Sequence, residues 1–577
     1  MNGAQGGPGS RGSRPLPSRS ARLAGPAAAV VGAALLFAGL LRGIPKVYDL
    51  PDHLGYTFQV LQAFARGDFY PRWLASLNDG FGEATYVFYP PVLHFTSAAL
   101  AALLGGDVLA GLYVALFLFA VAGGLGIFRF VSRVCGPEAG AIACLLFALV
   151  PFRVFEMYSS GLYSAFAAAG IAPWALLALA RIAETDESSP PWEKLRRVAL
   201  WALSFAAIVL TNMPSAVLWT YLIGIWVIAD VLVTRRWRLA ARVIAGGAWG
   251  SLIAGIYLLP AVVEMRWVDV PLETAYRSNF LFQGSGSGMK PGLKSMFDRM
   301  ELFPLLALAL SLAVFAVARQ WGELRDSRSS VFVHLTAVLG LASAFLASTA
   351  SVWAWRWLPE LKRVNFPWRF LEPMGLATAS AAAAALVLLW RASGRSVLVR
   401  ILALFFLVSL SAVCLVFDIA ISDAEGRVAP AVARAAIPSF SRKEVFFLLK
   451  GARRAADMAG EPPAVCEGSC RVQILDWSPT RRELLVSSPQ PTRVVLRTYY
   501  FPGWRGELRS SEPLPLRVGP EPGTGRIEIA VPAGDNRVVV RFTTTPPRVI
   551  GGIVSAAALA AGLAVLWRAR RSRLYQI

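Results

Sequence analysis

The amino-acid sequence predicts a polytopic α-helical membrane protein of about twelve spans, with a small extracytoplasmic β-rich domain. Of its 577 residues, 56% are hydrophobic and only 16% are charged. Several apolar runs reach the roughly twenty residues that a helix needs to cross a hydrocarbon core of about 30 Å. Glycine and proline recur inside these runs, as is tolerated where neighbouring helices satisfy the backbone. A polar block near the C-terminus alternates as β-strands do.

The charge balance narrows the range of partners. The net charge is +21, from 57 Lys and Arg against 36 Asp and Glu. Basic residues hold loops in the cytoplasm and meet anionic lipid headgroups, so this excess is typical of a membrane protein. No recognition motif for nucleic acid accompanies the charge, and no nucleic-acid partner is expected. No His/Cys cluster has the spacing of metal ligands, so no metal site or other cofactor is predicted.

The N-terminal two thirds of the chain predict a membrane domain over residues 23–421. Residues 1–22 are expected to be a disordered cytoplasmic tail, and 24–41 to be a retained first span, since no convincing cleavage site follows. Further spans are predicted at 107–128, 138–152, 161–182, 196–211, 214–233, 243–263, 301–318, 331–350, 370–390, 397–421 and 549–567. Basic connectors alternate correctly between them only if the short segment 91–104 is a half-helix at the outer face. Both termini are then cytoplasmic, and the loop 44–106 lies outside.

The block 422–546 predicts the extracytoplasmic β-rich domain, and 547–577 a final span with a basic cytoplasmic tail. Its second half contains RVVLRTYYF, RIEIAVPAG and RVVVRF, each bounded by Pro, Gly or Asp-Asn. Cys466 and Cys470 lie in this block, where a disulfide is favoured over a zinc site. The glycine-rich stretch 283–292 predicts a mobile lid, with an ordinary linker as the alternative.

The loop after the first span carries the first candidate catalytic groups. Asp49 and Asp52 lie within about ten residues of that span, where a carboxylate could accept a hydroxyl proton near the lipid headgroups. The alternatives are a solvated carboxylate or a cap for the helix that starts near Leu54. His53 could orient a hydroxyl or phosphate, or simply pack at the start of the helix. Asp52 is the better of the two acidic candidates.

Arginines on the same loop are candidate phosphate ligands. Arg66 and Arg72 could each hold a phosphate through their rigid fork of donors, although snorkelling at the interface is an equal alternative. Glu156, in FRVFEMYSSG, is expected where a span emerges on the outer face. Carboxylates at membrane depth are costly and usually functional, but ion pairing with Arg153 competes with that interpretation.

A third segment, ELKRVNFPWRFLE over 360–372, combines cations with aromatic rings. Lys362, Arg363 and Arg369 stand beside Phe366 and Trp368. Aromatic and basic side chains together suit the headgroup level of a bilayer. The same set could hold a lipid phosphate or diphosphate, with simple membrane anchoring as the alternative.

Together these segments resemble a known family. The early Asp loop, GDFYPRW, FGEATYVFYPP and NFPWRFLEP resemble the bacterial membrane family labelled 6-pyruvoyl-tetrahydropterin synthase-related, a historical label that implies no pterin chemistry here. The tail YYFPGWRGEL and GRIEIAVPAGDNRVVVRFTTTPPRVIGG looks like that of YfhO-like membrane proteins. Both families resemble the GT-C glycosyltransferases, multi-span enzymes of the bacterial inner membrane and other membranes that use polyprenyl-phosphate sugars.

The resemblance implies a reaction and roles for the candidates. A sugar would move from a polyprenyl-phosphate carrier to an extracytoplasmic glycan, lipid or protein acceptor by a single displacement at the anomeric carbon. The acidic base of the superfamily would fall on Asp52 or Asp49, and a second acidic position on Glu156. Arg72 and Arg369 would stabilise the departing phosphate. No Asp-x-Asp pair stands at the second outer turn, so a divalent metal is not supported.

Two other interpretations remain at this stage. A transporter or lipid flippase should bury ionisable groups near the midplane on discontinuous helices, whereas the acidic residues here are expected in outer loops. A non-catalytic envelope assembly protein that presents the β-rich domain would make Asp52 dispensable.

Overall fold

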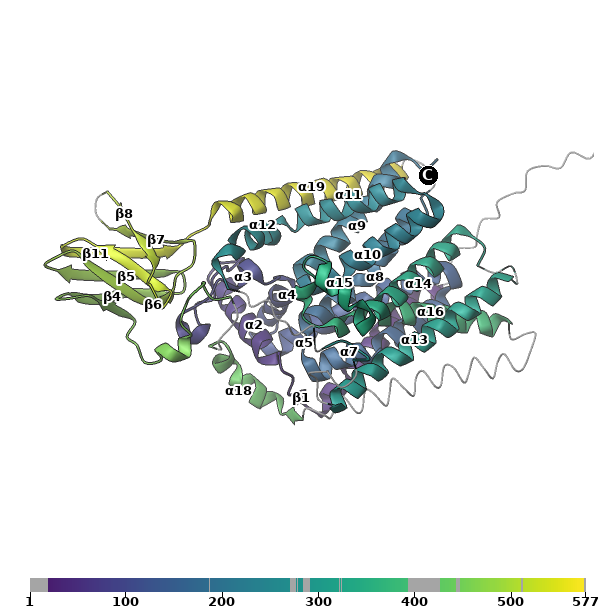
Figure 1. The fold of residues 1–577 in the computed structure, drawn as a ribbon, viewed down its shortest axis with the longest axis horizontal. Coiled ribbons are helices and arrows are strands. Elements are labelled where there is room, and N and C mark those ends of the chain that lie inside the picture. The colour runs from purple at the N-terminus through teal and green to yellow at the C-terminus, as the bar shows by residue number, and fades with distance from the viewer. Residues whose placement is uncertain are drawn as a thin grey trace, which may run out of the picture.

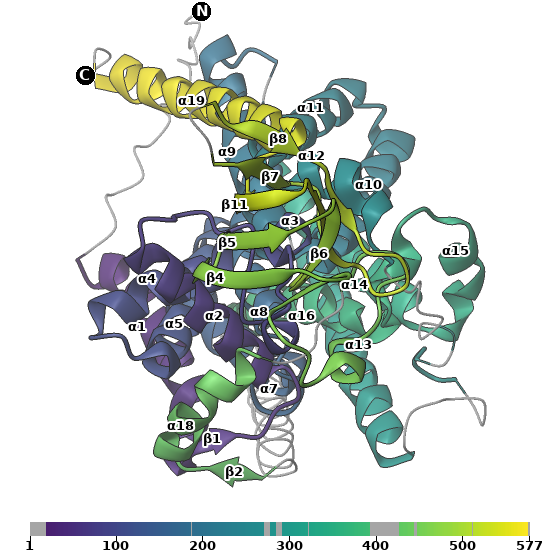
Figure 2. The ribbon, with the colours of Figure 1, turned by 90° about the vertical axis from the view of Figure 1, so that its left-hand side faces the viewer.

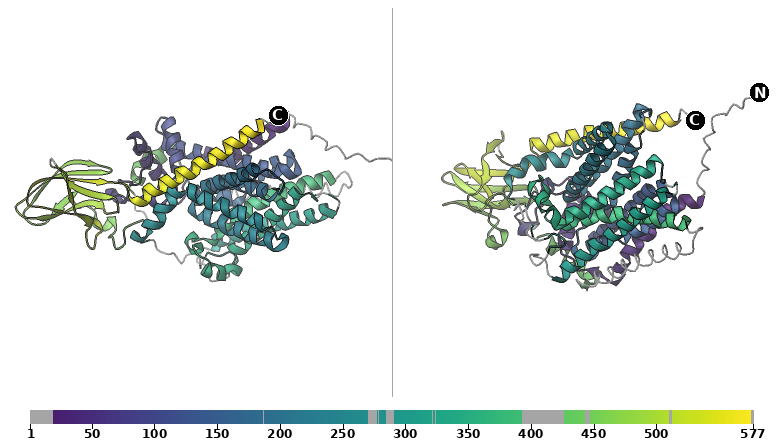
Figure 3. Two further views of the ribbon diagram at one scale, coloured as in Figure 1. Left: turned by 90° about the horizontal axis from the view of Figure 1, so that it is seen from above. Right: turned by 45° about the vertical axis from the view of Figure 1, so that its right-hand side comes forward.

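The computed structural model describes residues 19–185, 187–269, 277, 279–283, 291–320, 322, 324–392, 426–442, 447–509 and 512–574. Long helices form a bundle, and a β-sandwich lies beyond one end of it (Figure 1). Figure 2 views the molecule from the sandwich end. The last helix, α19, leaves the sandwich and runs back along the outside of the bundle (Figure 3). The predicted combination of a polytopic helical part and a β-rich C-terminal domain is confirmed.

The helical part consists of the following elements, in chain order: α1 (Arg19–Phe37), α2 (Leu50–Ala65), α3 (Thr85–Phe88), α4 (Val92–Leu103), α5 (Val108–Cys135), α6 (Pro137–Ala148), α7 (Pro151–Phe155), α8 (Tyr163–Ala183), α9 (Pro191–Thr211), α10 (Met213–Thr234), α11 (Trp237–Ile253), α12 (Gly255–Glu264), α13 (Pro291–Gln320), α14 (Ser327–Ala347), α15 (Val352–Trp357), α16 (Leu371–Ala392), α18 (Pro430–Phe440) and α19 (Pro546–Leu574). Short helical turns η3 (Glu156–Ser160), η7 (Leu361–Val364) and η8 (Pro367–Phe370) lie between them.

The number of spans differs from the prediction. Within the described residues, 8 helices are long and apolar enough to cross a membrane, or up to 10 if two bent helix pairs each count as one span. The predicted span 397–421 lies outside those residues, as do 284–290 of the predicted lid. The predicted span 196–211 is part of α9, whose first turns carry Glu193 and several cations. The figure of about twelve is therefore not confirmed.

The segment 91–104 forms α4, a helix of 12 residues. At 1.5 Å per residue it is about 18 Å long, which is too short to cross the hydrocarbon core. It packs against α2 and α5. Helix α4 thus closes the long first loop, which begins at the two-residue strand β1 (Ile44–Pro45).

The sandwich is built from two antiparallel sheets. The first has the strand order β3 (Ala464–Cys466), β6 (Thr492–Tyr499), β10 (Arg526–Val531) and β9 (Val518–Pro520). The second has the order β4 (Arg471–Ser478), β5 (Arg481–Ser488), β11 (Gly534–Phe542), β7 (Trp504–Leu508) and β8 (Leu514–Leu516). Leu484, Val494, Ile529 and Val538 alternate inward and are fully buried between the sheets. A disulfide joins Cys466 to Cys470.

The described part of the block before the sandwich contains the helix α18 and one two-residue strand, β2. β2 (Arg427–Val428) pairs with β1 of the first loop, and α18 packs on α2. Gly55 of α2 permits this contact, because a Cβ at that position would lie 2.8 Å from the carbonyl oxygen of Phe440. Segments from the C-terminal third thus hold the first loop in place.

The sandwich docks directly on the first loop. The amide of Tyr499 donates to the carbonyl oxygen of Phe81 at 2.8 Å, and Arg497 pairs with Asp79 at 2.6 Å. Trp73 packs against Trp504 and Phe542, with its ring centroid 5.3 and 5.2 Å from theirs, and those two rings also contact each other.

A buried ion pair completes this junction. Arg548, at the start of α19, pairs with Glu264, at the end of α12, at 2.8 Å, and both side chains are at most 3% exposed. Arg548 also donates to the carbonyl oxygen of Pro502 at 2.8 Å. This arginine therefore joins two helices of the bundle to the sandwich.

Candidate functional site

The acidic candidates of the first loop lie at the start of α2. Asp49 occupies the N-cap position, and Pro51 follows within the first turn, where the fixed φ of proline favours the start of a helix. The side chain of Asp49 makes no capping hydrogen bond, so capping does not explain its presence. Its backbone amide donates to the carbonyl oxygen of Ser160 at 3.3 Å. The start of α2 is thereby tied to the turn that follows Glu156.

His53 is buried next to these carboxylates, and the protein engages both of its ring nitrogens. Nε2 lies 3.1 Å from the carbonyl oxygen of Gly161, which can only accept, so Nε2 carries the proton. Nδ1 then accepts from Nε2 of His94 at 2.9 Å. Burial lowers the pKa of His53 to about 4, against the opposing effect of the Gly161 bond. The imidazole is thus neutral at ordinary pH.

Tyr89 reports which charged groups surround the site. Its hydroxyl lies 3.1 Å from Oγ of Ser164. Burial raises the pKa of Tyr89 to about 12; the charges of Asp49 and Asp52 raise it further, while Ser164 and Arg369 oppose them. Because a single phenol interacts with Asp49, Asp52 and Arg369, these three groups lie around one point of the structure.

Arg369 links the first loop to the carboxylates of the helix bundle. It lies on η8, which begins at Pro367, and its guanidinium carbon is 5.5 Å from the centroid of the Phe366 ring. It interacts electrostatically with Asp49 and, more weakly, with Glu156. Its Nε is buried and donates to no described residue. The structure therefore brings together three predicted residues that are far apart in the sequence.

Glu156 begins η3, a π-helical turn between α7 and Gly161. Its side chain is fully buried, and neither carboxylate oxygen accepts a hydrogen bond from a described residue. No contact within 4.0 Å pairs it with Arg153, although the two charges interact. Simple ion pairing between neighbours therefore does not account for this carboxylate.

Two residues that the sequence interpretation did not select complete the cluster. Arg153, only 2% exposed, lies between the rings of Phe147 and Phe166, whose centroids are 4.5 and 4.2 Å away. Glu372, 4% exposed, accepts a hydrogen bond from Oγ of Ser215 at 3.4 Å. Nε and Nη1 of Arg153, and Oε1 of Glu372, have no hydrogen-bond partner among the described residues.

The cluster of Asp49, Asp52, Arg153, Glu156, Arg369 and Glu372 has a clear chemical capacity. Buried polar atoms are normally satisfied, so several open donors and acceptors in one place indicate room for a polar ligand or water. The arginine donors suit a phosphate, and the carboxylates suit hydroxyl groups. We refer to this set as the charged cluster.

The remaining candidates lie elsewhere. Arg66 is exposed at the C-terminal end of α2, about 20 Å from Asp52 along the helix. Arg72 donates to the carbonyl oxygens of Tyr86 and Ile256 at 2.9 and 2.8 Å, which holds the first loop on α12. Lys362 and Arg363 are exposed on η7, and Arg363 pairs with Glu360 at 2.6 Å. The structure does not bring these four residues to the charged cluster.

Glu83 is a further buried acid of the first loop that the sequence interpretation passed over. Its Oε1 accepts from the amide of Phe447 at 3.0 Å, and Oε2 accepts from Asn78 at 3.4 Å. Burial raises the pKa of Glu83 to about 8, against these two hydrogen bonds. A Glu in the aromatic stretch FGEATYVFYPP was the available signal, since an acid among apolar residues seldom stays solvated.

A metal site does not emerge from the part of the chain that the structure describes. No three His, Cys, Asp or Glu side chains gather there closely enough to hold a metal ion. His53 and His94 bond to each other, and no acidic side chain joins them in such a group.

The structural comparisons find partial likenesses at low identity. ArnT from Cupriavidus metallidurans bound to undecaprenyl phosphate is 14% identical, with 74% of each chain covered and a TM-score of 0.42. The archaeal oligosaccharyltransferase AglB from Archaeoglobus fulgidus is 13% identical, covering 71% of this chain and 57% of that one, with a TM-score of 0.44. Arabinofuranosyltransferase AftD from Mycobacteria is 20% identical, covering 66% and 26%, with a TM-score of 0.37.

The sequence comparisons identify the family. No curated protein matches the chain. A family model described as "6-pyruvoyl-tetrahydropterin synthase related domain; membrane protein" matches residues 86–424, which is more than half of the chain. That match includes Arg153, Glu156, Arg369 and Glu372 of the charged cluster. The chain therefore belongs to the 6-pyruvoyl-tetrahydropterin synthase-related family of membrane proteins.

Proposed function

We propose that the protein is a glycosyltransferase of the bacterial inner membrane, with both termini in the cytoplasm. It would transfer a sugar from a polyprenyl-phosphate carrier to an acceptor outside the cytoplasm, namely a glycan, lipid or protein. The observation that carries the proposal is the convergence of Asp49, Glu156 and Arg369 from three distant segments. The resemblance of these segments to the GT-C glycosyltransferases supports the same assignment.

The first-loop carboxylates are the proposed bases. Asp52, or Asp49 beside it, accepts the proton of the acceptor hydroxyl as its oxygen forms a bond to the anomeric carbon. The bond from that carbon to the phosphate oxygen breaks, and its electron pair leaves with the lipid phosphate. General base catalysis of this kind contributes roughly a hundred- to ten-thousandfold in rate.

The buried arginines are the proposed phosphate ligands. Negative charge develops on the phosphate as the sugar leaves, and donors already in place stabilise that charge without reorganisation. Arg369 and Arg153 offer open N–H groups in a buried setting. Glu156 and Glu372 interact with Arg153, and so balance its charge when no phosphate is bound.

The histidine pair is proposed to position the base rather than to contact substrate. His53 binds the carbonyl oxygen of Gly161, and its amide binds the carbonyl oxygen of Asp49 at 3.1 Å. The side-chain bond holds the start of α2 against the turn that carries Glu156, and the amide bond closes the first turn of α2 itself. Arg72 has a similar role, because one of its bonds joins two parts of the first loop, at Tyr86, and the other joins the loop to Ile256 of α12.

A transporter or lipid flippase is the second candidate function, and one observation favours it. Glu156, on the turn η3, and Glu372, in the first turn of α16, are both buried among apolar helices. Glu156 also belongs to a helix pair that bends by 40° at its break. Buried ionisable groups on discontinuous helices are typical of transporters.

The test uses a strain that lacks the protein and is complemented with single variants. Asp52→Asn, Asp49→Asn and Arg369→Gln are compared with Asp68→Asn, an exposed acid of the same loop. Mass spectrometry of the membrane lipids and envelope glycans is the measurement. An enzyme is expected to accumulate an unused lipid-linked sugar and to lose one glycan product in at least one first-loop variant and in Arg369→Gln, but not in Asp68→Asn.

Two outcomes contradict the proposal. Normal lipid and glycan profiles from both Asp49→Asn and Asp52→Asn would exclude the catalytic carboxylate. A flippase would instead accumulate its lipid substrate on the cytoplasmic leaflet, where a reagent that cannot cross the membrane does not reach it.

A further inference from the structure

One face of the five-stranded sheet carries a row of arginines at the end that meets the membrane part. Arg481 of β5 lies opposite Arg541 of β11, which lies opposite Arg505 of β7. Side chains that face each other across antiparallel strands lie on the same side of the sheet, about 5 Å apart. We call these three residues the arginine row. Like charges in such positions destabilise a sheet unless an anion compensates them.

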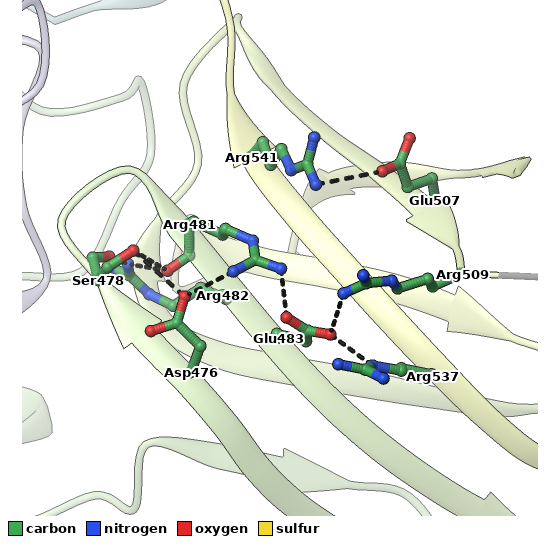
Figure 4. A network of polar contacts seen from close by, with 9 residues as sticks. All are labelled: Asp476, Ser478, Arg481, Arg482, Glu483, Glu507, Arg509, Arg537 and Arg541. Carbon is green, nitrogen blue, oxygen red and sulfur yellow. Dashed lines mark hydrogen bonds and ion pairs between the residues drawn. The ribbon is translucent and has the colours of Figure 1, made fainter.

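The acidic residues of this face are already committed. Two residues further along the strands, Glu483 and Glu507 flank Val539. Glu483 is 4% exposed and pairs with Arg481, Arg509 at 3.1 Å and Arg537 (Figure 4). Glu507 reaches Arg541 only at 3.8 Å. Asp476 of β4 also pairs with Arg481, at 3.1 Å, so Arg481 has two acidic partners. These acids lie on one side of the arginine row, toward the far end of the sandwich.

The other side of the row faces the membrane part. Phe542 follows Arg541 on β11, and Trp504 precedes Arg505 on β7. Both aromatic rings contact Trp73 of the first loop. The last span begins at Pro546, so Arg541 lies five residues before it. A fully extended chain of that length covers at most about 18 Å.

The exposed apolar surface of α19 begins a few residues after the arginine row. Val549, Ile550 and Ile553 of α19 are 45%, 51% and 64% exposed, as expected for a helix surface that meets acyl chains. A bilayer around this helix would place its headgroup phosphates beside those residues, on the side of the sandwich that carries the arginine row. Arg505 and Arg541 are both exposed and are not crowded by a nearer acid.

We propose that Arg505 and Arg541 of the arginine row bind the phosphates of anionic lipid headgroups and so hold the sandwich on the bilayer surface, while Arg481 stays paired with Asp476 and Glu483. The guanidinium fork matches a phosphate and binds it through paired hydrogen bonds. Attraction to an anionic surface strengthens binding about fivefold for each basic residue close to it. This binding would be independent of the transfer reaction, because none of the three arginines belongs to the charged cluster.

Native mass spectrometry of the full chain in detergent tests the proposal, with phosphatidylglycerol and phosphatidylcholine of the same acyl chains as probes. The test variant is Arg505→Gln with Arg541→Gln, which leaves the Glu483 network intact. The control variant is Arg471→Gln with Arg493→Gln, two exposed arginines toward the other end of the strands. It has the same change of charge.

The expected result is a loss of phosphatidylglycerol binding of about twentyfold in the test variant, with no loss in the control and none for phosphatidylcholine. Phosphatidylglycerol binding that is as strong in the test variant as in the wild type overturns the proposal. Equal loss in both variants also overturns it, because net charge alone would then explain the binding. Soluble polyphosphate is the third probe: loss of its binding with normal lipid binding would show a soluble polyanion as the partner instead.

Discussion

Breaking the buried pair between Glu264 and Arg548 should release the sandwich from the helix bundle. Both side chains are at most 3% exposed, so neither charge can turn to solvent when its partner is lost. Removal of one member of such a pair costs about 3 to 5 kcal/mol, because the other charge stays buried. The Glu264→Ala variant also deprives Thr545 of its acceptor. Undocked states should therefore become more frequent by about two to four orders of magnitude.

Hydrogen exchange at the junction measures this change. The amide of Tyr499 donates to Phe81, and the amide of Arg509 donates to the carbonyl oxygen of Arg537 at 2.7 Å, so Tyr499 reports docking and Arg509 reports the sandwich itself. Glu264→Ala should accelerate exchange at Tyr499 far more than at Arg509. The double variant Glu264→Leu with Arg548→Met should recover most of the protection, because it leaves no charge unpaired. Unchanged exchange at Tyr499 in the single variant would refute the reasoning, as would a double variant that exchanges as fast as the single one.

Three further predictions follow from buried groups. Glu83 has a pKa raised to about 8, so its contribution to the free energy of unfolding is complete below about pH 4.5 and is lost as the pH rises through about 8. The thermal unfolding temperature of the wild type should therefore fall from pH 6 to pH 9, whereas that of Glu83→Gln should not. An equal fall in both proteins would contradict this role. His53→Ala leaves the carbonyl oxygen of Gly161 and Nε2 of His94 without their hydrogen-bond partner, at a cost of about 1 to 3 kcal/mol for each group. The unfolding temperature should fall, and an unchanged value would argue against a structural role of the histidine pair. Gly170→Ala places a Cβ 2.3 Å from the carbonyl oxygen of Phe119 and should push α5 away from α8, whereas the Cβ of Gly224→Ala meets nothing within 4 Å. The yield of folded protein in detergent should therefore be lower for Gly170→Ala than for Gly224→Ala. Equal yields would refute the close contact.

Local sequence patterns predicted most of the elements but few of the contacts. Hydropathy places the spans at Tyr163–Ala183 and Met213–Thr234 within two residues, because a span is a property of consecutive side chains. Alternation places β6, β10 and β11 for the same reason. The helix α18 was missed because the polar block was interpreted as a whole, although Pro430 at its first position is a helix-start signal.

The candidate site was predictable in part. Glu156 was selected because a charge beside an apolar run is costly, and that cost is visible in the sequence. Arg369 was selected because it stands among aromatic rings and other cations, a combination that suits a lipid phosphate. Glu372 is also a charge beside an apolar run, in the first turn of α16, but the sequence interpretation did not select it as a candidate. The pairing of His53 with His94, and the docking of Glu83 on Phe447, depend on segments that meet only after folding. No local pattern encodes which distant partner a buried polar group will find.

The pairing of β1 with β2 has a consequence for synthesis. Pro45 lies opposite Arg427, so the ribosome makes the second strand roughly 380 residues after the first. At about 5 to 20 residues per second, this interval is on the order of 20 to 80 seconds. The loop that carries Asp49 and Asp52 therefore lacks its pairing with β2 while most of the spans are inserted. A chain that is truncated during translation before residue 427 would therefore contain these carboxylates on a loop that lacks the pairing with β2.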